Sequence, residues 1–175
     1  MLKGVIERLK RRDMIAYAKA IGVAVGENVL IAANVNFDTE PYLIKIGGGS
    51  YITSGVRFVT HDGAVYVLKR NGLLKGDGGF PDMISIGENC YIGNNVSIMP
   101  GVHIGNNVIV GYGSIVTHSI PDNEVWAGIP ARRIESLQEY LEKNKDKYIL
   151  SPSDPEGKRK YLLDYFKNRD TQSHK

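Results

Sequence analysis

The sequence predicts an all-β solenoid with helices at both ends, and three observations support this fold class. Six consecutive hexapeptides run from Ile86 to Pro121 and read IGENCY, IGNNVS, IMPGVH, IGNNVI, VGYGSI and VTHSIP. A period of six fits neither the 3.6-residue period of a helix nor simple strand alternation, so it indicates short strands separated by turns. Apolar residues at helical spacing both precede and follow these repeats.

Each hexapeptide has the same internal pattern. It opens with an aliphatic residue, and four places later it carries a small or aliphatic residue that we expect to point inward. Gly and Asn crowd the turns, where we expect backbone conformations that strain any residue with a Cβ. Three hexapeptides would close one triangular coil. The expected inward residues are Cys90, Val96, Val102, Val108, Ser114 and Ile120.

An earlier stretch of the chain follows the same rule. VGENVL begins at Val25 and IAANVN at Ile31; after the irregular segment DTEPYLIK, IGGGSY begins at Ile46 and ITSGVR at Ile52. Phe37 and Phe58 continue the two series before each one breaks. We therefore predict one β-helix over residues 23–129, interrupted by a loop at 62–83.

The two ends of this solenoid are expected to be covered by helices, because open coils would expose unpaired backbone groups. Residues 2–20 show helical spacing and predict a capping helix within residues 1–22. The region 130–175 is predicted to be helical, with an amphipathic helix from about Pro130 to Lys147. A second helix is expected from Asp154 to Lys167, with Ser153 or Asp154 as its cap and Pro155 at its first position.

Composition bounds the protein further. A chain of 175 residues with 42% hydrophobic content predicts a single domain over residues 1–175. The net charge of +3 and the lack of an aromatic-basic motif argue against nucleic-acid binding. We find neither a signal peptide nor a stretch of about 18 apolar residues, so we expect a cytoplasmic protein without a membrane span. Cys90 is the single cysteine, and a buried structural role is favoured over an acyl-carrying nucleophile.

The motifs around these repeats resemble a known family. FVTHDGAV places His61 at an interrupted coil, a loop follows, and ISIGENCYIG resumes the hexapeptides. The closing run GSIVTHSIPDNEVWAGIPARRI completes a pattern that covers roughly residues 23–134. This combination resembles the hexapeptide-repeat acyltransferases, which include galactoside, maltose and nodulation-factor acetyltransferases, and EPYLIKIG with ITSGV and THDG resembles their polysaccharide-cluster subgroup. The resemblance implies a left-handed parallel β-helix.

The same resemblance implies an activity. It implies direct transfer of an acetyl group from acetyl-CoA to a saccharide hydroxyl, with His61 as general base, in a homotrimer whose donor grooves lie between subunits. If the irregular segment adds three residues to its coil, Phe58 stacks over Phe37, and His61 then lies over Glu40 with Asp38 close by. Glu40 is therefore the first candidate to orient His61 or to contact the substrate.

Further site residues are assigned with the family as guide. The acceptor would be contacted by Asn34, Asn36, Asp38 and Asp62, and the loop 62–83 is expected to act as a lid that helps to select it. The cofactor groove would include a larger set in which His118 replaces the usual Lys and two arginines compensate for the lost charge. That set is Tyr112, Gly113, Thr117, His118, Gly128, Arg132 and Arg133.

Three alternatives remain open at this level. A metalloenzyme built on the same helix would need three convergent His ligands, for which His61, His103 and His118 are the candidates; their spacing disfavours this, and we predict no metal. A non-catalytic β-helix scaffold would need no His61 at a coil break. An N-acetyltransferase of an amino sugar would use similar geometry with a different acceptor.

Overall fold

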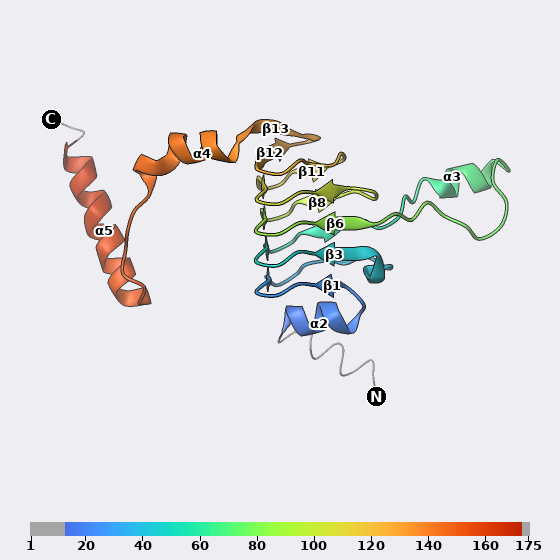
Figure 1. The fold of residues 1–175 in the computed structure, drawn as a ribbon, viewed down its shortest axis with the longest axis horizontal. Coiled ribbons are helices and arrows are strands. Elements are labelled where there is room, and N and C mark those ends of the chain that lie inside the picture. Colours follow the sequence, from blue (N-terminus) through green and yellow to red (C-terminus); the bar gives the residue numbers. More distant parts are fainter. Residues whose placement is uncertain (1–12, 173–175) are drawn as a thin grey trace. The chain divides into compact units, whose positions relative to one another are not determined.

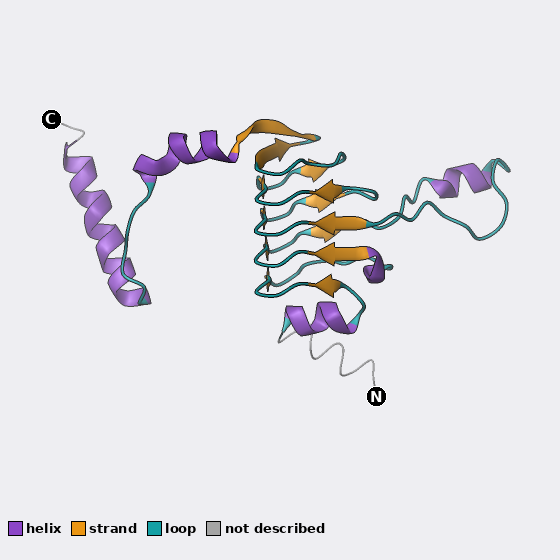
Figure 2. Cartoon of the chain, viewed as in Figure 1, coloured by secondary structure: helices purple, strands orange, loops and turns teal. Residues whose placement is uncertain are grey.

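The computed structural model describes residues 13–172 and shows a parallel β-helix (Figures 1 and 2). Every coil contributes short strands to flat faces, which we call the first, second and third sheets. The first sheet has the order β1 (Ala24–Val25), β3 (Ile44–Ile46), β6 (Ile84–Ile86), β9 (His103–Ile104). The second has the order β2 (Leu30–Ile31), β4 (Tyr51–Ile52), β7 (Tyr91–Ile92), β10 (Ile109–Val110), β12 (Glu124–Gly128), β13 (Ala131–Ser136). The third contains β5 (Arg57–Phe58), β8 (Ser97–Ile98) and β11 (Ile115–Val116).

The register of the first sheet shows where the coils carry extra residues. Ser85 pairs with His103, which lies three hexapeptides further along the chain, and this is the coil length that the period predicts. Ala24 pairs with Lys45, so that coil exceeds three hexapeptides by the expected short addition. Lys45 pairs with Ser85, and the coil between them is more than twice the regular length because it contains a long insertion. The two irregular coils are therefore neighbours, and the candidate site lies in them.

The core lies inside the coils and follows the predicted inward pattern. All six residues expected inward are buried, as are the aliphatic residues that open the hexapeptides, such as Ile92 and Ile98. Cys90 is one of these core residues, with its Sγ 3.0 Å from the carbonyl oxygen of Gly105. Burial raises the pKa of the Cys90 thiol, which disfavours the thiolate. The structural role expected for this cysteine agrees with its position.

Gly and Asn occupy the turns for two different reasons. Asn89, Asn95 and Asn107 have φ between 54° and 58°, the left-handed region in which Asn is tolerated. Gly87 has no such φ; instead, a Cβ there would lie 2.6 Å from the carbonyl oxygen of Gly105 in the next coil. Backbone strain, the reason expected from the sequence, therefore explains only some of these turn residues. At Gly87 the reason is the close contact between coils, which leaves no room for a side chain.

A short helix covers the first coil. It is α2 (Met14–Ala20), and its N-cap Asp13 accepts hydrogen bonds from the backbone N–H groups of Ile15 and Ala16, each 3.0 Å long. Met14 and Ala18 are buried against the core. This is the later part of the predicted capping helix, and residues 1–12 of that prediction lie outside the described residues.

The opposite end of the β-helix differs from the expected helix beginning at Pro130. Residues 131–136 form β13, which pairs antiparallel with β12, and α4 (Leu137–Asn144) begins only after it. The 3₁₀ turn η2 (Lys145–Lys147) follows. Pairing with the last parallel strand satisfies backbone groups that an open edge would leave exposed, and this outweighs the helical spacing of the local sequence.

The described residues fall into two compact units, 13–140 and 141–172, and the single domain over residues 1–175 stays a prediction. Between residues 141 and 169, no side chain is buried. Helix α5 (Pro155–Gln172) starts as predicted, with Pro155 first and the Asp154 carboxylate accepting from the Gly157 N–H at 2.7 Å. Within residues 13–172, no helix has the length and apolar character needed to cross a membrane.

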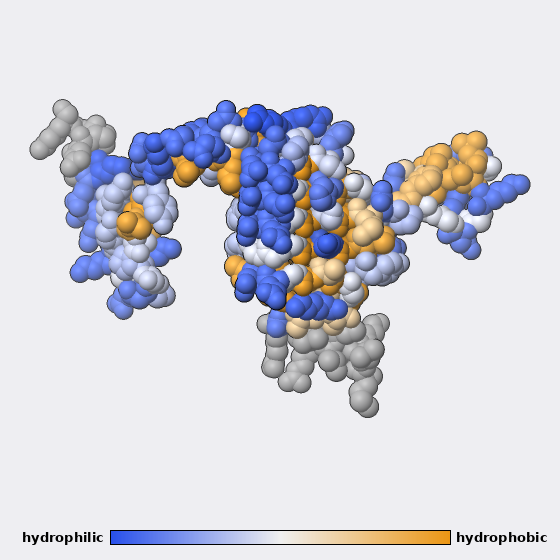
Figure 3. Space-filling model, in the orientation of Figure 1, coloured by the Kyte–Doolittle hydropathy of each residue, from blue (hydrophilic) through white to orange (hydrophobic). Residues whose placement is uncertain are grey.

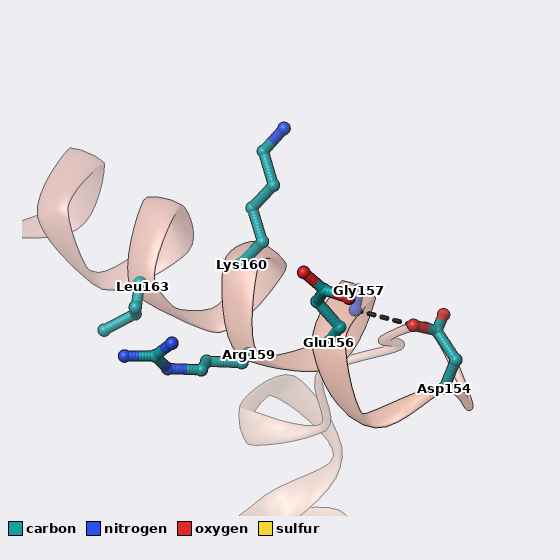
Figure 4. Close-up of a pocket in the computed structure, with 6 residues that line it drawn as sticks. All are labelled: Asp154, Glu156, Gly157, Arg159, Lys160 and Leu163. Atoms are coloured by element: carbon teal, nitrogen blue, oxygen red, sulfur yellow. Dashed lines mark hydrogen bonds between the residues drawn. The ribbon is translucent and has the colours of Figure 1, made fainter.

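The start of α5 borders an open pocket, shown in Figure 4. The side chains of Arg159 and Lys160 point in different directions there, and the Asp154 carboxylate is already used as the helix cap (Figure 4). These groups do not converge on a common point, so we assign no site to this unit.

We expect the tightly packed coils to be sensitive to cavities. Ile92 is fully buried at the centre of the second sheet, so Ile92→Ala should lower the free energy of unfolding by about 2–5 kcal/mol. Val67→Ala, at an exposed position, should change it by less than about 0.5 kcal/mol. Denaturant unfolding at one fixed protein concentration measures both changes, and equal effects would contradict the assigned core.

Candidate active site

His61 lies where the inserted segment leaves the β-helix. It follows β5 at the corner between the third and first sheets and forms an isolated antiparallel bridge with Pro81. On either side of it, the Asp82 N–H donates to the Thr60 carbonyl at 2.9 Å, and the Asp62 N–H donates to the Phe80 carbonyl at 3.2 Å. The insertion therefore leaves and returns at one point, which holds the backbone of His61 in place.

The inserted segment itself carries α3 (Val65–Arg70) and projects from the β-helix near β6 (Figure 1). Hydrophobic atoms gather along the upper side of this segment in Figure 3, while its tip and underside are hydrophilic. Several large apolar side chains of this segment are exposed, among them Tyr66, Val67 and Leu73. An exposed apolar surface of this kind is typical of a segment that contacts a ligand or another chain.

Stacking of the two irregular coils brings the predicted partner of His61 beneath it. Phe58 stacks on Phe37, with ring centroids 5.5 Å apart and an interplanar angle of 13°. Asn36 bridges to Arg57 in parallel register, which aligns the following residues of the two coils. Glu40 and Asp38 both lie within 3.5 Å of the His61 Nδ1, so the expected neighbourhood is confirmed.

The carboxylate of Glu40 is held by three neighbours on one oxygen. Its Oε2 is 2.9 Å from the Nδ1 of His61, and it accepts hydrogen bonds from the hydroxyls of Thr60 at 2.6 Å and Thr39 at 2.8 Å. A carboxylate held this way accepts a hydrogen bond from Nδ1–H. The imidazole then carries its proton on Nδ1, and Nε2 remains available as a base.

Asp38 forms the other wall of this cluster. It adopts φ of 57°, and the side-chain oxygen of Asn36 accepts from its backbone N–H at 2.8 Å. Its Oδ2 accepts from the backbone N–H of Thr60 at 2.9 Å and lies 3.5 Å from the Nδ1 of His61. Asp38 thus anchors the turn below the histidine and adds a second negative charge near the ring.

These contacts shift two ionisations in opposite directions. The pKa of Glu40 is lowered, first by the hydrogen bond from Thr60 and then by that from Thr39. The pKa of His61 is raised, mainly by its hydrogen bond to Glu40 and further by the negative charges of Asp38, Glu40 and Asp62, while desolvation opposes the shift. Glu40 therefore stays ionised and supports a positive charge that develops on the imidazole.

A pocket of about 460 Å³ opens next to the histidine. His61 is partly exposed to it, with 38% of its side chain accessible. Its lining residues come from three parts of the chain: the irregular segment before β3, the end of the coil at His61, and the inserted segment. Its lining residues are Glu40, Tyr42, Leu43, His61, Asp62, Val65, Asp77, Gly78, Gly79 and Pro81.

A second pocket, of about 600 Å³, shares Asp62, Gly79 and Pro81 with the first and continues to Met99 and Pro100. The backbone N–H of Val59 donates to the carbonyl of Ile98, so Met99 lies on the coil above Val59. In the same way, the backbone N–H of Met99 donates to the carbonyl of Val116 on the following coil. The same register places Thr117 above Met99. A continuous edge of the β-helix thus leads from His61 toward Thr117 and His118.

The predicted cofactor residues do not all share this edge. Thr117 and His118 follow β11 at the corner of His61 and contact each other, with Oγ1 and Nδ1 2.9 Å apart. Tyr112 and Gly113 instead follow β10 at the corner between the second and third sheets. There the Gly113 N–H donates to the Asn94 carbonyl, and the Tyr112 hydroxyl accepts from the Asn95 amide.

The two arginines lie on β13. Arg133 is bound by carboxylates, with its Nε 2.9 Å from Glu124 and a terminal nitrogen 3.6 Å from Glu139. Arg132 is exposed and donates to the Ala131 carbonyl at 2.8 Å. Among the carboxylates of the described residues, none binds Arg132.

The predicted acceptor contacts are also divided. Asp62 lines both pockets, whereas Asn34 and Asn36 line neither. Asn34 takes a turn position with φ of 63°, and the side-chain oxygen of Asn36 is used by Asp38. Sequence reasoning did not identify Thr39, Thr60 or Tyr42, and the adjacency of Thr60 to His61 was the available signal.

The three histidines considered as metal ligands contact different partners. His61 binds Glu40, the Nδ1 of His103 is 2.6 Å from the Ser85 hydroxyl, and His118 contacts Thr117. Within residues 13–169, the only group of three side chains with metal-ligating atoms close together is Asp38, Glu40 and His61. It contains one histidine, and neither His103 nor His118 belongs to it.

Comparison with known proteins agrees with the repeat pattern. Residues 83–118 match the family described as bacterial transferase hexapeptide (six repeats), and residues 16–36 match the hexapeptide repeat of succinyl-transferase. Protein CapG of Staphylococcus aureus is 38% identical over 180 residues, which cover 95% of this chain and 97% of that protein. Galactoside O-acetyltransferase of Escherichia coli K12 is 39% identical over 65% of this chain and 57% of its own length.

Solved structures give the same result. A galactoside acetyltransferase in complex with coenzyme A has a TM-score of 0.59 and 26% identity, over 87% of this chain and 84% of that one. A maltose O-acetyltransferase from Clostridium difficile has a TM-score of 0.57 and 25% identity, over 76% and 84%. These likenesses support the left-handed coil expected from the hexapeptides. The chain is an acyltransferase and belongs to the hexapeptide-repeat O-acetyltransferase family.

Proposed function

We propose that this protein transfers an acetyl group from acetyl-CoA directly to a hydroxyl of a saccharide, with His61 as general base. The observation that carries the proposal is the hydrogen bond between His61 and Glu40 at the mouth of a pocket, in a chain of this family. Nε2 of His61 would take the hydroxyl proton as the acceptor oxygen attacks the thioester carbonyl. The tetrahedral intermediate would then expel the CoA thiolate, and the same Nε2–H would protonate it.

The two pockets support separate binding sites for the acceptor and for CoA along the edge of the β-helix. The first, between Glu40 and the insertion, would hold the acceptor, because it adjoins His61 and is lined by carboxylates that accept hydrogen bonds from hydroxyls. The second leads over Met99 and Pro100 toward Thr117, and its apolar floor suits a pantetheine chain. Arg132 is the cation proposed for the CoA phosphates.

We also propose a homotrimer with donor sites between subunits. The outward side chains of the second sheet support it, because Leu30, Tyr51, Tyr91 and Ile109 stand in one register across its parallel strands and are all at least partly exposed. Tyr51 and Tyr91 pack edge to face with ring centroids 5.9 Å apart, and both remain exposed. The corresponding positions on the first sheet include Lys45, Ser85 and His103, which are polar. Cytoplasmic location stays a prediction of the sequence.

Replacing the base should abolish transfer without abolishing donor binding. We expect His61→Ala to lower kcat by roughly 10²–10⁴-fold, while the Kd for acetyl-CoA changes little. The measurement is CoA release with acetyl-CoA and a panel of sugars, nucleotide sugars, serine and amino sugars. His103→Ala is the matched control, since it removes a histidine outside the pockets.

Each result of that panel decides between the alternatives. Release with a hydroxyl acceptor that disappears in His61→Ala supports the proposal. Release with amines alone would establish an N-acetyltransferase, and absence of acetyl-CoA binding would favour the scaffold.

The acid limb of the pH profile should depend on Glu40. His61 must be neutral to act as base, and its raised pKa moves the loss of activity on acidification to higher pH than an unperturbed histidine would show. Glu40→Gln removes the negative charge that favours the imidazolium, so the acid limb of kcat/KM should move to lower pH and kcat should fall. Glu27→Gln, at an exposed position, should leave the limb in place, and an unmoved limb in Glu40→Gln would contradict the assigned pair.

The apolar row on the second sheet should control assembly. The double substitution Tyr51→Asp, Tyr91→Asp should convert a trimer into single chains of 19.3 kDa, because burying two carboxylates in an apolar interface is costly. Lys45→Asp, on the first sheet, should leave the trimer intact. Light scattering after size-exclusion chromatography measures the mass, and an unmodified protein that runs as a monomer would disprove the trimer.

A further inference from the structure

The acceptor pocket has an uneven charge that bears on which saccharides enter it. Three carboxylates line it, those of Glu40, Asp62 and Asp77, and none of its ten lining residues is Lys or Arg. The only other titrating group with a possible positive charge is His61, which is neutral when it acts as base. In the state that reacts, the lining residues of this chain therefore supply three negative charges and no positive one.

The carboxylates reach the pocket from three different parts of the chain. Glu40 comes from the irregular coil, Asp62 from the coil end, and Asp77 from the returning limb of the insertion. Hydrogen bonds to Thr39, Thr60 and His61 fix one oxygen of Glu40, and Asp62 accepts from the Ala64 N–H at 2.8 Å. Among the described residues, no side chain or backbone N–H donates to the Asp77 carboxylate. The charges thus line the pocket beside His61, and no Lys or Arg of this lining neutralises them.

The remaining walls suit a sugar ring. Tyr42 is 67% exposed, and the rest of the lining includes apolar side chains such as Leu43 and Val65. An aromatic face contacts the C–H groups of a sugar, while carboxylate oxygens accept hydrogen bonds from its hydroxyls. An acceptor that carries its own carboxylate or phosphate would instead place like charges together in a partly enclosed space.

We propose that the acceptor unit held in this pocket is a saccharide without negative charge, and that Asp62 and Asp77 exclude uronic acids and phosphorylated sugars. The inference rests on the proposed function and adds a selection by charge at the same site. Repulsion can exclude a charged sugar without any direct contact with it. This accounts for carboxylates that line the pocket of a neutral base, His61.

The test compares ligands of nearly the same shape that differ in charge. The methyl glycosides of glucuronic and galacturonic acid are matched with their primary amides, which keep the shape and every ring hydroxyl. Each is titrated as a competitive inhibitor against the best hydroxyl acceptor of the panel, at low salt. We expect the carboxylates to bind at least about tenfold more weakly than the amides.

Variants assign the effect to the pocket. The ratio of inhibition constants should fall in Asp77→Asn and fall further when Asp62→Asn is added, whereas Glu27→Gln, which removes a carboxylate outside the pocket, should leave it unchanged. Higher salt should also reduce the ratio, because screening weakens repulsion. Equal binding of acid and amide, or tighter binding of the acid, overturns the inference while the transfer itself persists. Failure of every hydroxyl acceptor contradicts the proposed function instead, so the two failures are distinguishable.

Discussion

The structure depends on the direct stacking of each coil's backbone on the next. A short strand makes few hydrogen bonds, so its stability comes from the ladder that runs through all the coils, as when Gly47 donates to Ile86 and Gly87 to Ile104, each at 2.8 Å. This ladder requires the coils to approach so closely that a Cβ at Gly87 would meet the next backbone. The ladder also requires a constant coil length. Extra residues therefore fit only as loops that project from the β-helix between two strands.

That requirement explains the location of the candidate active site. The short addition to one coil lies before β3, and the long insertion of the next coil lies before β6; both strands belong to the first sheet. Together these two segments supply most of the pocket proposed for the acceptor. His61 and Glu40 stand on adjacent coils whose vertical alignment is set by the ladder and by the stacked rings of Phe37 and Phe58. The regular part of the fold thus positions two irregular segments, and those segments carry the residues that we propose for the reaction.

The repeat made much of this arrangement predictable. A period of six identifies the inward residues without any knowledge of partners, and the same counting brings Glu40 beneath His61. Residues 131–136 were not predictable in this way, because their strand forms only when β12 offers an edge, which no local pattern records. The hydroxyls of Thr39 and Thr60 were missed for a related reason, since their convergence on one oxygen depends on side-chain geometry across two coils. Tyr112 and Thr117 were grouped by resemblance, yet they follow different strands and lie at different corners.

The inserted segment has its two ends bridged at one place, beside His61. The coils above and below are therefore joined through Thr60 and Asp82 whatever the length of chain between them. Natural variation in this segment can change the outer wall of the acceptor pocket, including Asp77, Gly78 and Gly79, while the imidazole and its carboxylate keep their places. Under the proposed function, a transplanted segment would carry the part of the selectivity that depends on Asp77, Gly78 and Gly79, whereas the part that depends on Glu40 and Tyr42 would stay with the coils.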